Sequence, residues 1–77
     1  MEVKVFFFGV LAEVTGTRFK HYRDVKSIGD LKISIQDEFP EIVHYTFRVS
    51  LNNEITDNDL RLKSGDEVAF MPPFHKK

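Results

Sequence analysis

The stretch that decides the fold runs from Leu62 to Pro73 and reads LKSGDEVAFMPP. Its Ser64-Gly65-Asp66 segment is typical of a turn, because Gly65 can adopt a positive φ without steric cost. Residues 67–71 then alternate polar and apolar side chains, which predicts a strand. Pro72-Pro73 ends that strand, since neither proline can donate a ladder hydrogen bond. We therefore expect a central strand that leads into a short projecting tail, residues 74–77.

The beginning of the chain predicts a second strand. Residues 3–8 alternate between the two sides of an extended segment, with Val3, Val5 and Phe7 on one side and Lys4, Phe6 and Phe8 on the other. Their β-branched and aromatic content favours a strand over a helix. Phe6 and Phe8 on the side away from the core have two interpretations: a sheet that is covered on both faces, or an exposed apolar binding patch.

The following segment predicts a polar edge strand. Gly9 breaks the first strand, residues 10–14 can form one helical turn, and Thr15-Gly16 reverses the chain. Residues 17–23 then extend again, with Arg18, Lys20, His21 and Arg23 interleaved with Phe19 and Tyr22. Charged side chains protect an edge strand against pairing with other chains. Phosphate binding by the same basic residues is the alternative function.

A single main helix is predicted in the middle of the chain. Ser27-Ile28-Gly29-Asp30 resembles a capping box in which Ser27 is the N-cap. An apolar stripe at helical spacing follows, consisting of Ile28, Leu31, Ile35 and Phe39. Pro40 ends the helix at Phe39. Ile33 falls on the opposite side of this helix, where a single exposed apolar residue is common.

The rest of the chain predicts short strands and turns. Residues 41–45 form a short connection, and residues 47–51 alternate as a third strand. Asn52-Asn53 suits a two-residue hairpin turn, because asparagine tolerates positive φ, and residues 54–56 return as a short strand. We expect Leu60 and Leu62 to pack the next loop against the core.

The order of these elements indicates the fold class. Strand, strand, helix, strand, short strand and strand predict an α+β fold in which one helix lies across one face of a mixed sheet. This is the β-grasp arrangement, with the first and last strands parallel and adjacent in the middle. All of residues 1–77 are expected to form one β-grasp domain, from which residues 74–77 project.

The composition excludes several classes of protein. The chain has no cysteine, which leaves neither a disulfide framework nor a thiolate metal site. Its formal net charge of −1 argues against a basic nucleic-acid binder. It contains no apolar run long enough to span a membrane and no signal peptide, so we expect a cytoplasmic protein.

No self-contained catalytic site can be argued from the residues. His21, His44 and His75 lack the spacing of metal ligands, and the acidic residues between Asp57 and Glu67 lack the pattern of a calcium loop. No glycine-rich loop follows a strand and opens a helix, and no serine lies in a nucleophile elbow. We therefore expect no bound metal and no bound cofactor.

Two segments resemble a known family. The opening from Val5 to Gly16, VFFFGVLAEVTG, is similar to the start of molybdopterin synthase small subunits, the ubiquitin-like sulfur carriers. The stretch from Leu62 to Pro73 is similar to their last strand, and its Gly-Asp-Glu-Val start and Pro-Pro end are the specific part. The resemblance extends over the whole chain.

The resemblance implies a function in molybdenum cofactor biosynthesis. In this family an activating enzyme adenylates the terminal carboxylate with ATP, and sulfur then replaces the adenylate to give a thiocarboxylate. The tail enters the large subunit, which holds the catalytic site, so the small subunit is a carrier and no enzyme by itself. The residues expected to contact these partners are Phe6, Phe8, Met71, Pro72, Pro73 and Phe74.

The tail departs from the family. Where the family has a terminal pair of glycines, this sequence has Lys76-Lys77, so the carboxylate of Lys77 stands where a glycine carboxylate would. Long cationic side chains suit a narrow tunnel poorly, whereas glycine has no Cβ. The alternative function is thus a tail-inactive β-grasp interaction module, which docks the large subunit or the activating enzyme without transferring sulfur. A third alternative is a natural tail that differs after Phe74.

Overall fold

A computed structural model describes residues 1–73, and residues 74–77 lie outside the described part. The elements follow one another as β1 (Glu2–Phe7), α1 (Val10–Thr15), β2 (Phe19–Arg23), α2 (Ile28–Glu38), the 3₁₀ helix η1 (Pro40–His44), β3 (Arg48–Leu51), β4 (Glu54–Thr56) and β5 (Glu67–Met71). This order is the predicted one. The second strand begins at Phe19, two residues later than expected.

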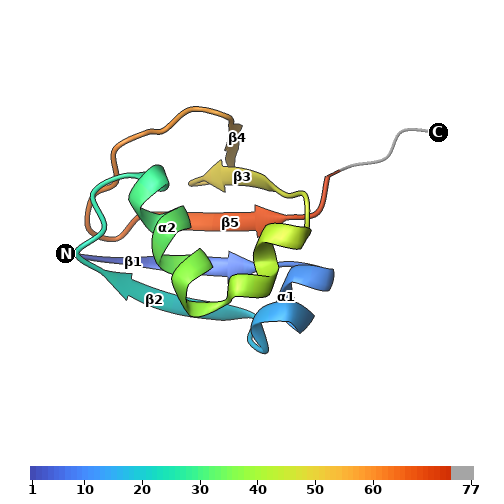
Figure 1. Cartoon of the computed structure of the whole chain (residues 1–77). Helices are drawn as coiled ribbons and strands as arrows, with labels where there is room; N and C mark the ends of the chain where they lie inside the picture. Colours follow the sequence, from blue (N-terminus) through green and yellow to red (C-terminus); the bar gives the residue numbers. More distant parts are fainter. Residues whose placement is uncertain (74–77) are drawn as a thin grey trace.

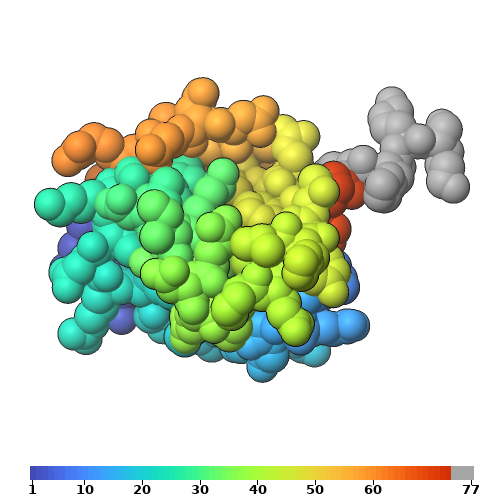
Figure 2. Space-filling view, in the orientation of Figure 1, coloured from blue at the N-terminus to red at the C-terminus, as the bar shows by residue number. Residues whose placement is uncertain are grey.

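The strands form one mixed five-stranded sheet in the order β2-β1-β5-β3-β4. As predicted, β1 and β5 are parallel neighbours, and the remaining pairs are antiparallel. Helix α2 lies across one face of the sheet (Figure 1), and the space-filling view shows the side that α2 and η1 cover (Figure 2). The α+β prediction of a mixed sheet with one main helix on one face is confirmed.

The core lies between α2 and the sheet. The inward side chains of β1 and β5 meet the apolar stripe of α2, and each of these is at most 2% exposed: Val3, Val5, Phe7, Val68, Phe70, Ile28, Leu31 and Ile35. The ring of Phe70 is central, with its centroid 6.0 Å from that of Phe7 and 5.0 Å from that of Phe47. Strand alternation in β1 and β5 and helical spacing in α2 therefore identified the core correctly.

Helix α2 begins and ends where its sequence predicts. The Ser27 hydroxyl accepts a hydrogen bond from the backbone N–H of Asp30 at 3.1 Å, and the Asp30 carboxylate accepts one from the backbone N–H of Lys26 at 3.2 Å. The first bond satisfies an N–H group that a helix start leaves without an intrahelical partner, and the second ties the residue before the N-cap to the first turn. Phe39 is the C-cap, directly before Pro40.

The turns also adopt the expected backbone conformations, with one correction in the loop before β5. Asn52 and Asn53 have φ values of 50° and 75°, and Gly65 has a φ of 89°. Leu62 is buried as expected, whereas Leu60 is 39% exposed, so the expectation for Leu60 was wrong. Leu60 contributes its backbone instead, because its carbonyl accepts a hydrogen bond from the N–H of Ile28 at 2.9 Å.

A buried carboxylate ties the start of β5 to the β3–β4 turn. Asp66 is 5% exposed and accepts hydrogen bonds from the backbone N–H of Lys63 at 2.8 Å and the side-chain amide of Asn52 at 3.1 Å. The Asn52 side-chain oxygen accepts one from the backbone N–H of Glu67 at 2.9 Å. Burial alone raises the pKa of Asp66, but these hydrogen bonds and the Lys63 charge outweigh it and hold the pKa below its usual value of 3.8.

We expect Asp66 to make the fold sensitive to acid. Its pKa is lower in the folded than in the unfolded chain, so its contribution to stability is present above about pH 4 and is lost as the pH falls through the folded-state pKa. At neutral pH, Asp66→Asn should lower the free energy of unfolding in urea by about 1–3 kcal/mol. The difference between the two proteins should shrink as the pH falls through the folded-state pKa of Asp66. A difference that stays constant with pH would contradict this role.

Candidate functional site

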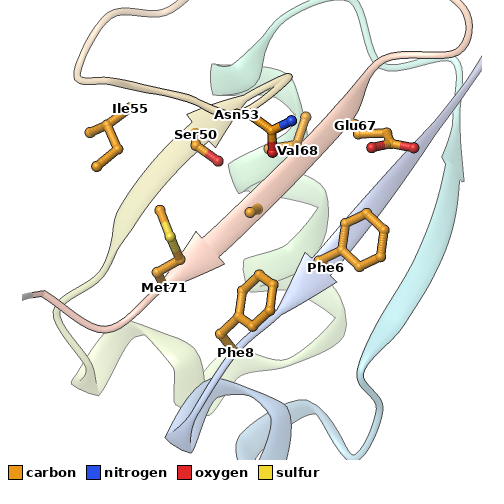
Figure 3. A pocket seen from close by; sticks show the side chains of 9 residues that line it. Phe6, Phe8, Ser50, Asn53, Ile55, Glu67, Val68 and Met71 are labelled. Atoms are coloured by element: carbon orange, nitrogen blue, oxygen red, sulfur yellow. The ribbon is translucent and has the colours of Figure 1, made fainter.

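The face of the sheet opposite α2, here called the outer face, carries alternate side chains of the strands. On β1 and directly after it these are Lys4, Phe6 and Phe8, and on β5 they are Glu67, Ala69 and Met71. Figure 3 looks onto this face, with α2 behind the sheet. Within residues 1–73 no helix or strand packs over it, so the described sheet is covered on one face only.

One row of cross-strand neighbours explains the shape of the outer face. The strand register places Phe19, Phe6, Ala69, Ser50 and Ile55 side by side, on β2, β1, β5, β3 and β4 respectively. Large side chains stand at both ends of this row, and two small ones lie in the middle. A hollow, here called the groove, therefore lies over β5 and β3, with Phe6 and Ile55 as its walls.

The groove is open and mostly apolar. It has a volume of about 480 Å³ and is lined by Phe6, Phe8, Ser50, Asn53, Ile55, Glu67, Val68, Ala69 and Met71. In Figure 3, Phe6 and Phe8 form one wall, Ile55 stands on the opposite wall, and Met71 lies at the end of β5. The groove thus runs along the last strand toward the point where the chain leaves the sheet.

Phe6 and Phe8 form one wall of the groove, and Phe19 continues this aromatic row beyond it. The ring centroids of Phe6 and Phe8 are 6.4 Å apart, with the rings stacked, and those of Phe6 and Phe19 are 6.3 Å apart. The ammonium of Lys4 lies 5.0 Å from the Phe6 centroid and 4.5 Å from the Phe19 centroid, within the range of a cation–π contact. We call Phe8, Phe6 and Phe19 the aromatic ridge.

The aromatic ridge and the far wall of the groove are open to solvent. Phe8 is 49% exposed, Phe19 48% and Ile55 49%. Scattered exposed apolar residues are ordinary, whereas these three lie on one face of the sheet, and Phe8 and Ile55 line the groove. An exposed apolar surface of this kind is typical of a protein–protein contact site. The arrangement therefore favours the binding-patch interpretation of Phe6 and Phe8.

A second apolar hollow lies where the chain leaves β5. It is lined by Phe8, Met71, Pro72 and Pro73 and has a volume of about 400 Å³. Gly9 lies against Pro72, because a Cβ at this position would lie 2.9 Å from the Pro72 ring, and its φ of 58° also favours glycine. Phe8 and Met71 line both this hollow and the groove, so the two form one continuous surface.

The structure brings together five of the six residues that the sequence proposed for partner contact. Phe6, Phe8 and Met71 line the groove, and Pro72 and Pro73 line the hollow beside it. Phe74 and the Lys76-Lys77 pair lie outside the described residues. Their roles, like partner contact by the other five, stay predictions.

Sequence reasoning missed the other half of the groove. Strand alternation could have placed Phe19 on the outer face, because the next residue of the same strand, Lys20, faces the helix side. Ala69, Ser50 and Ile55 could not, because the groove depends on the register of three strand pairings. An alanine or serine carries no sign in the sequence that it forms the floor of a hollow.

The basic residues of β2 do not converge. Lys20 faces the helix side of the sheet, where it forms an ion pair with Glu38 of α2, and the Tyr22 hydroxyl donates a hydrogen bond to the same carboxylate at 2.8 Å. Arg23 pairs with Glu2 at 3.9 Å. β2 is an edge strand, as predicted. These positions favour the edge-protection interpretation over a phosphate site.

Residues 1–73 offer neither a metal site nor a membrane-spanning helix. In this part of the chain no three His, Asp or Glu side chains are grouped so that they could hold a metal ion. None of the described helices has the length and apolar character that crossing a membrane requires. The groove and its adjoining hollow are the candidate site, and their apolar lining suits the docking of another protein.

Comparison with known proteins identifies the family and the fold. The sequence model of the ThiS family matches residues 5–75. A search of curated proteins gives no match. Among solved structures, the chain is similar to the putative molybdopterin converting factor subunit 1 from Pyrococcus furiosus, with a TM-score of 0.87 and 20% identity over 96% of this chain and 99% of that one.

Two further solved structures have the same fold. Small archaeal modifier protein 1 from Haloferax volcanii matches with a TM-score of 0.82 and 24% identity, over 95% of this chain and 98% of that one. Subunits 1 and 2 of the molybdopterin-converting factor from Helicobacter pylori were solved as a complex, of which one chain matches with a TM-score of 0.74 and 24% identity over 100% of both chains. These similarities confirm a ubiquitin-like β-grasp fold.

Proposed function

The chain belongs to the ThiS family, and we propose that it acts in molybdenum cofactor biosynthesis as the small-subunit partner of a molybdopterin synthase large subunit. The observation that carries this proposal is the groove, an exposed apolar surface that continues to the point where the chain leaves β5. Two structural neighbours are described as subunit 1 of a molybdopterin converting factor, and one of these was solved with its subunit 2. Both support a large subunit as the partner.

The fold suits a protein that docks with one surface and delivers with another. β5 is held on both sides, by β1 and by β3, so the position from which the tail leaves is fixed relative to the groove. A partner bound over Phe8 and Met71 lies next to Pro72-Pro73. Docking therefore brings residues 74–77 close to the partner and replaces a diffusional encounter of the tail by a local one.

Two functions are compatible with this docking. Sulfur carriage as a C-terminal thiocarboxylate is the role of the family, and ATP would be consumed by the activating enzyme and not by this chain. The second candidate is a tail-inactive module that binds the large subunit or the activating enzyme without transferring sulfur. Lys76 and Lys77, at the positions where the resemblance places glycines, favour this second candidate.

The tail decides between carriage and docking alone. We expect the chain printed here, with Lys77 as its last residue, to gain no sulfur when it is incubated with the activating enzyme, ATP and a sulfur donor. The reason is that two long cationic side chains obstruct a channel shaped for residues without Cβ atoms. Lys76→Gly combined with Lys77→Gly should restore the reaction. Mass spectrometry of the intact protein measures it, because sulfur is heavier than the oxygen that it replaces.

A matched control shows whether the loss of long side chains, and not substitution as such, restores the reaction. Lys76→Arg with Lys77→Arg keeps two long cations and should stay without sulfur, as the unsubstituted chain does. Thiocarboxylate on the unsubstituted chain would contradict the docking-only function and make the protein an ordinary sulfur carrier. Failure of all three proteins, with a sulfur carrier of known activity modified in parallel, would refute the role that we assign to the lysines.

A further inference from the structure

Gly9 and Pro72 meet where the chain leaves β5. A Cβ at Gly9 would lie 2.9 Å from Cγ and 3.4 Å from Cδ of Pro72, so the proline ring lies directly against the Gly9 backbone. Gly9 also has a φ of 58° and a ψ of −135°, a conformation that residues with a Cβ rarely adopt. This position therefore requires glycine for two independent reasons, the space that Pro72 occupies and the backbone angles.

Gly9 is a rigid support for the Pro72 ring. On one side, the backbone N–H of Phe8 donates a hydrogen bond to the carbonyl of Phe70 at 3.0 Å, which ties the end of β1 to β5. On the other side, the Gly9 carbonyl accepts a hydrogen bond from the backbone N–H of Ala12 at 3.0 Å, which ties it to α1. The Gly9 backbone is therefore held between the sheet and α1.

The segment that lies against this support is itself stiff. β5 last pairs with β1 at Phe70 and with β3 at Met71, so neither strand ladder extends to Pro72. Each proline fixes its own φ and restricts the residue before it to an extended conformation. Residues 71–73 thus form a short rod, and its direction relative to the sheet is set where Pro72 lies against Gly9.

We propose that Gly9 is a positioning residue for the tail, because through Pro72 it sets the direction in which the chain leaves β5. This inference rests on the proposed function, in its form in which an activating enzyme adenylates the terminal carboxylate. In that step a carboxylate oxygen bonds to the α-phosphorus of ATP, and pyrophosphate leaves with the electron pair of the broken P–O bond. A reacting group that is misplaced by about 1 Å can lose about a hundredfold in rate.

Two alanine substitutions, one at each end of α1, test this assignment. Gly9 and Gly16 both have positive φ, 58° and 76°, but a Cβ at Gly16 would meet no atom of a neighbouring segment within 4 Å. Both substitutions therefore strain the backbone, and only Gly9→Ala displaces Pro72. The background is the chain with Lys76→Gly and Lys77→Gly, which we expect to react. ATP–pyrophosphate exchange by the activating enzyme, with the chain as the varied substrate, gives kcat and KM.

The expected result is a loss of rate without an equal loss of binding. Gly9→Ala should lower kcat by about tenfold or more and change KM by less than about threefold, since the tail is misplaced while the docking surface remains. Gly16→Ala should leave both constants within about twofold. Pro72→Ala should also lower kcat, and adding Gly9→Ala to it should cause little further loss, because Gly9 acts through the ring that has been removed.

Three outcomes would overturn this inference alone. They are an unchanged kcat in Gly9→Ala, equal losses of kcat in Gly9→Ala and Gly16→Ala, and a change confined to KM, which would mean that Gly9 serves docking. Circular dichroism shows which variants fold. If Gly9→Ala does not fold, Pro72→Ala replaces it, since it removes the same contact from beyond the last strand, and an unchanged kcat in that variant would overturn the inference as well.

A separate measurement distinguishes failure of the proposed function. Calorimetry with the large subunit shows whether the unsubstituted chain docks, and it does not depend on the tail reaction. Absence of exchange in the background chain, while a sulfur carrier of known activity reacts in parallel, would refute sulfur carriage and this inference together, because no tail reaction would remain for Gly9 to serve.

Discussion

Phe70→Ala is expected to remove most of the protein's free energy of unfolding at room temperature. Phe70 lies in the central strand β5, is fully buried and packs against the rings of Phe7 and Phe47. Truncating a buried phenylalanine costs about 3–5 kcal/mol. A chain of this size has a total stability near the lower end of the usual range, about 5 kcal/mol. Circular dichroism during urea and thermal unfolding measures the loss.

The matched control for Phe70→Ala is the same substitution on the outer face. Phe19→Ala removes an aromatic ring that is 48% exposed, so it should cost less than about half as much. Both variants change the same side chain, and they differ only in the face of the sheet on which it lies. A small loss for Phe70 together with a large loss for Phe19 would mean that the two faces have been assigned the wrong way round.

Phe8→Ala is expected to produce the largest change in binding. Phe8 lines both the groove and the hollow beside Pro72 and Pro73, so its ring belongs to the centre of the proposed contact surface. Removing an aromatic residue at the centre of an interface typically costs at least about 2 kcal/mol, which is about thirtyfold in affinity. Titration calorimetry with the large subunit measures this effect. Phe8→Ala should cost much less stability than Phe70→Ala, because Phe8 is 49% exposed.

The control for Phe8→Ala lies on the other side of the molecule. Ile33→Ala on α2 removes an apolar side chain that is 60% exposed and should leave the affinity unchanged. Equal affinity of Phe8→Ala and the unsubstituted chain, with both proteins folded, would show that the large subunit contacts another surface.

Local signals in the sequence were sufficient for the elements of the fold. Strand alternation separated Phe7 from Phe8, a serine marked the start of α2, Pro40 marked its end, and Asn52-Asn53 marked a hairpin turn. Each of these features depends on residues only a few positions apart, where steric and hydrogen-bonding preferences act directly. The parallel pairing of β1 with β5 followed from the order of the elements.

Features that depend on distant partners were not visible in the sequence. Asp66 appeared to be a turn residue, and its burial depends on an amide that Asn52 supplies from another hairpin. The groove likewise requires Ala69 and Ser50 to lie side by side between larger neighbours, which only the strand register determines. Side-chain alternation predicts the face on which a residue lies, but it does not predict the residue beside it on the next strand.

The central claim is that the outer face of the sheet docks a large subunit, and methyl NMR during a titration tests it most directly. Ile55 and Met71 provide methyl reporters at the groove, while Ile33 and Val43 provide reporters on the helix side, where both are exposed. On addition of unlabelled large subunit, the signals of Ile55 and Met71 should shift or broaden, and those of Ile33 and Val43 should stay in place. Changes confined to Ile33 and Val43, or no change at any of the four, would contradict the account.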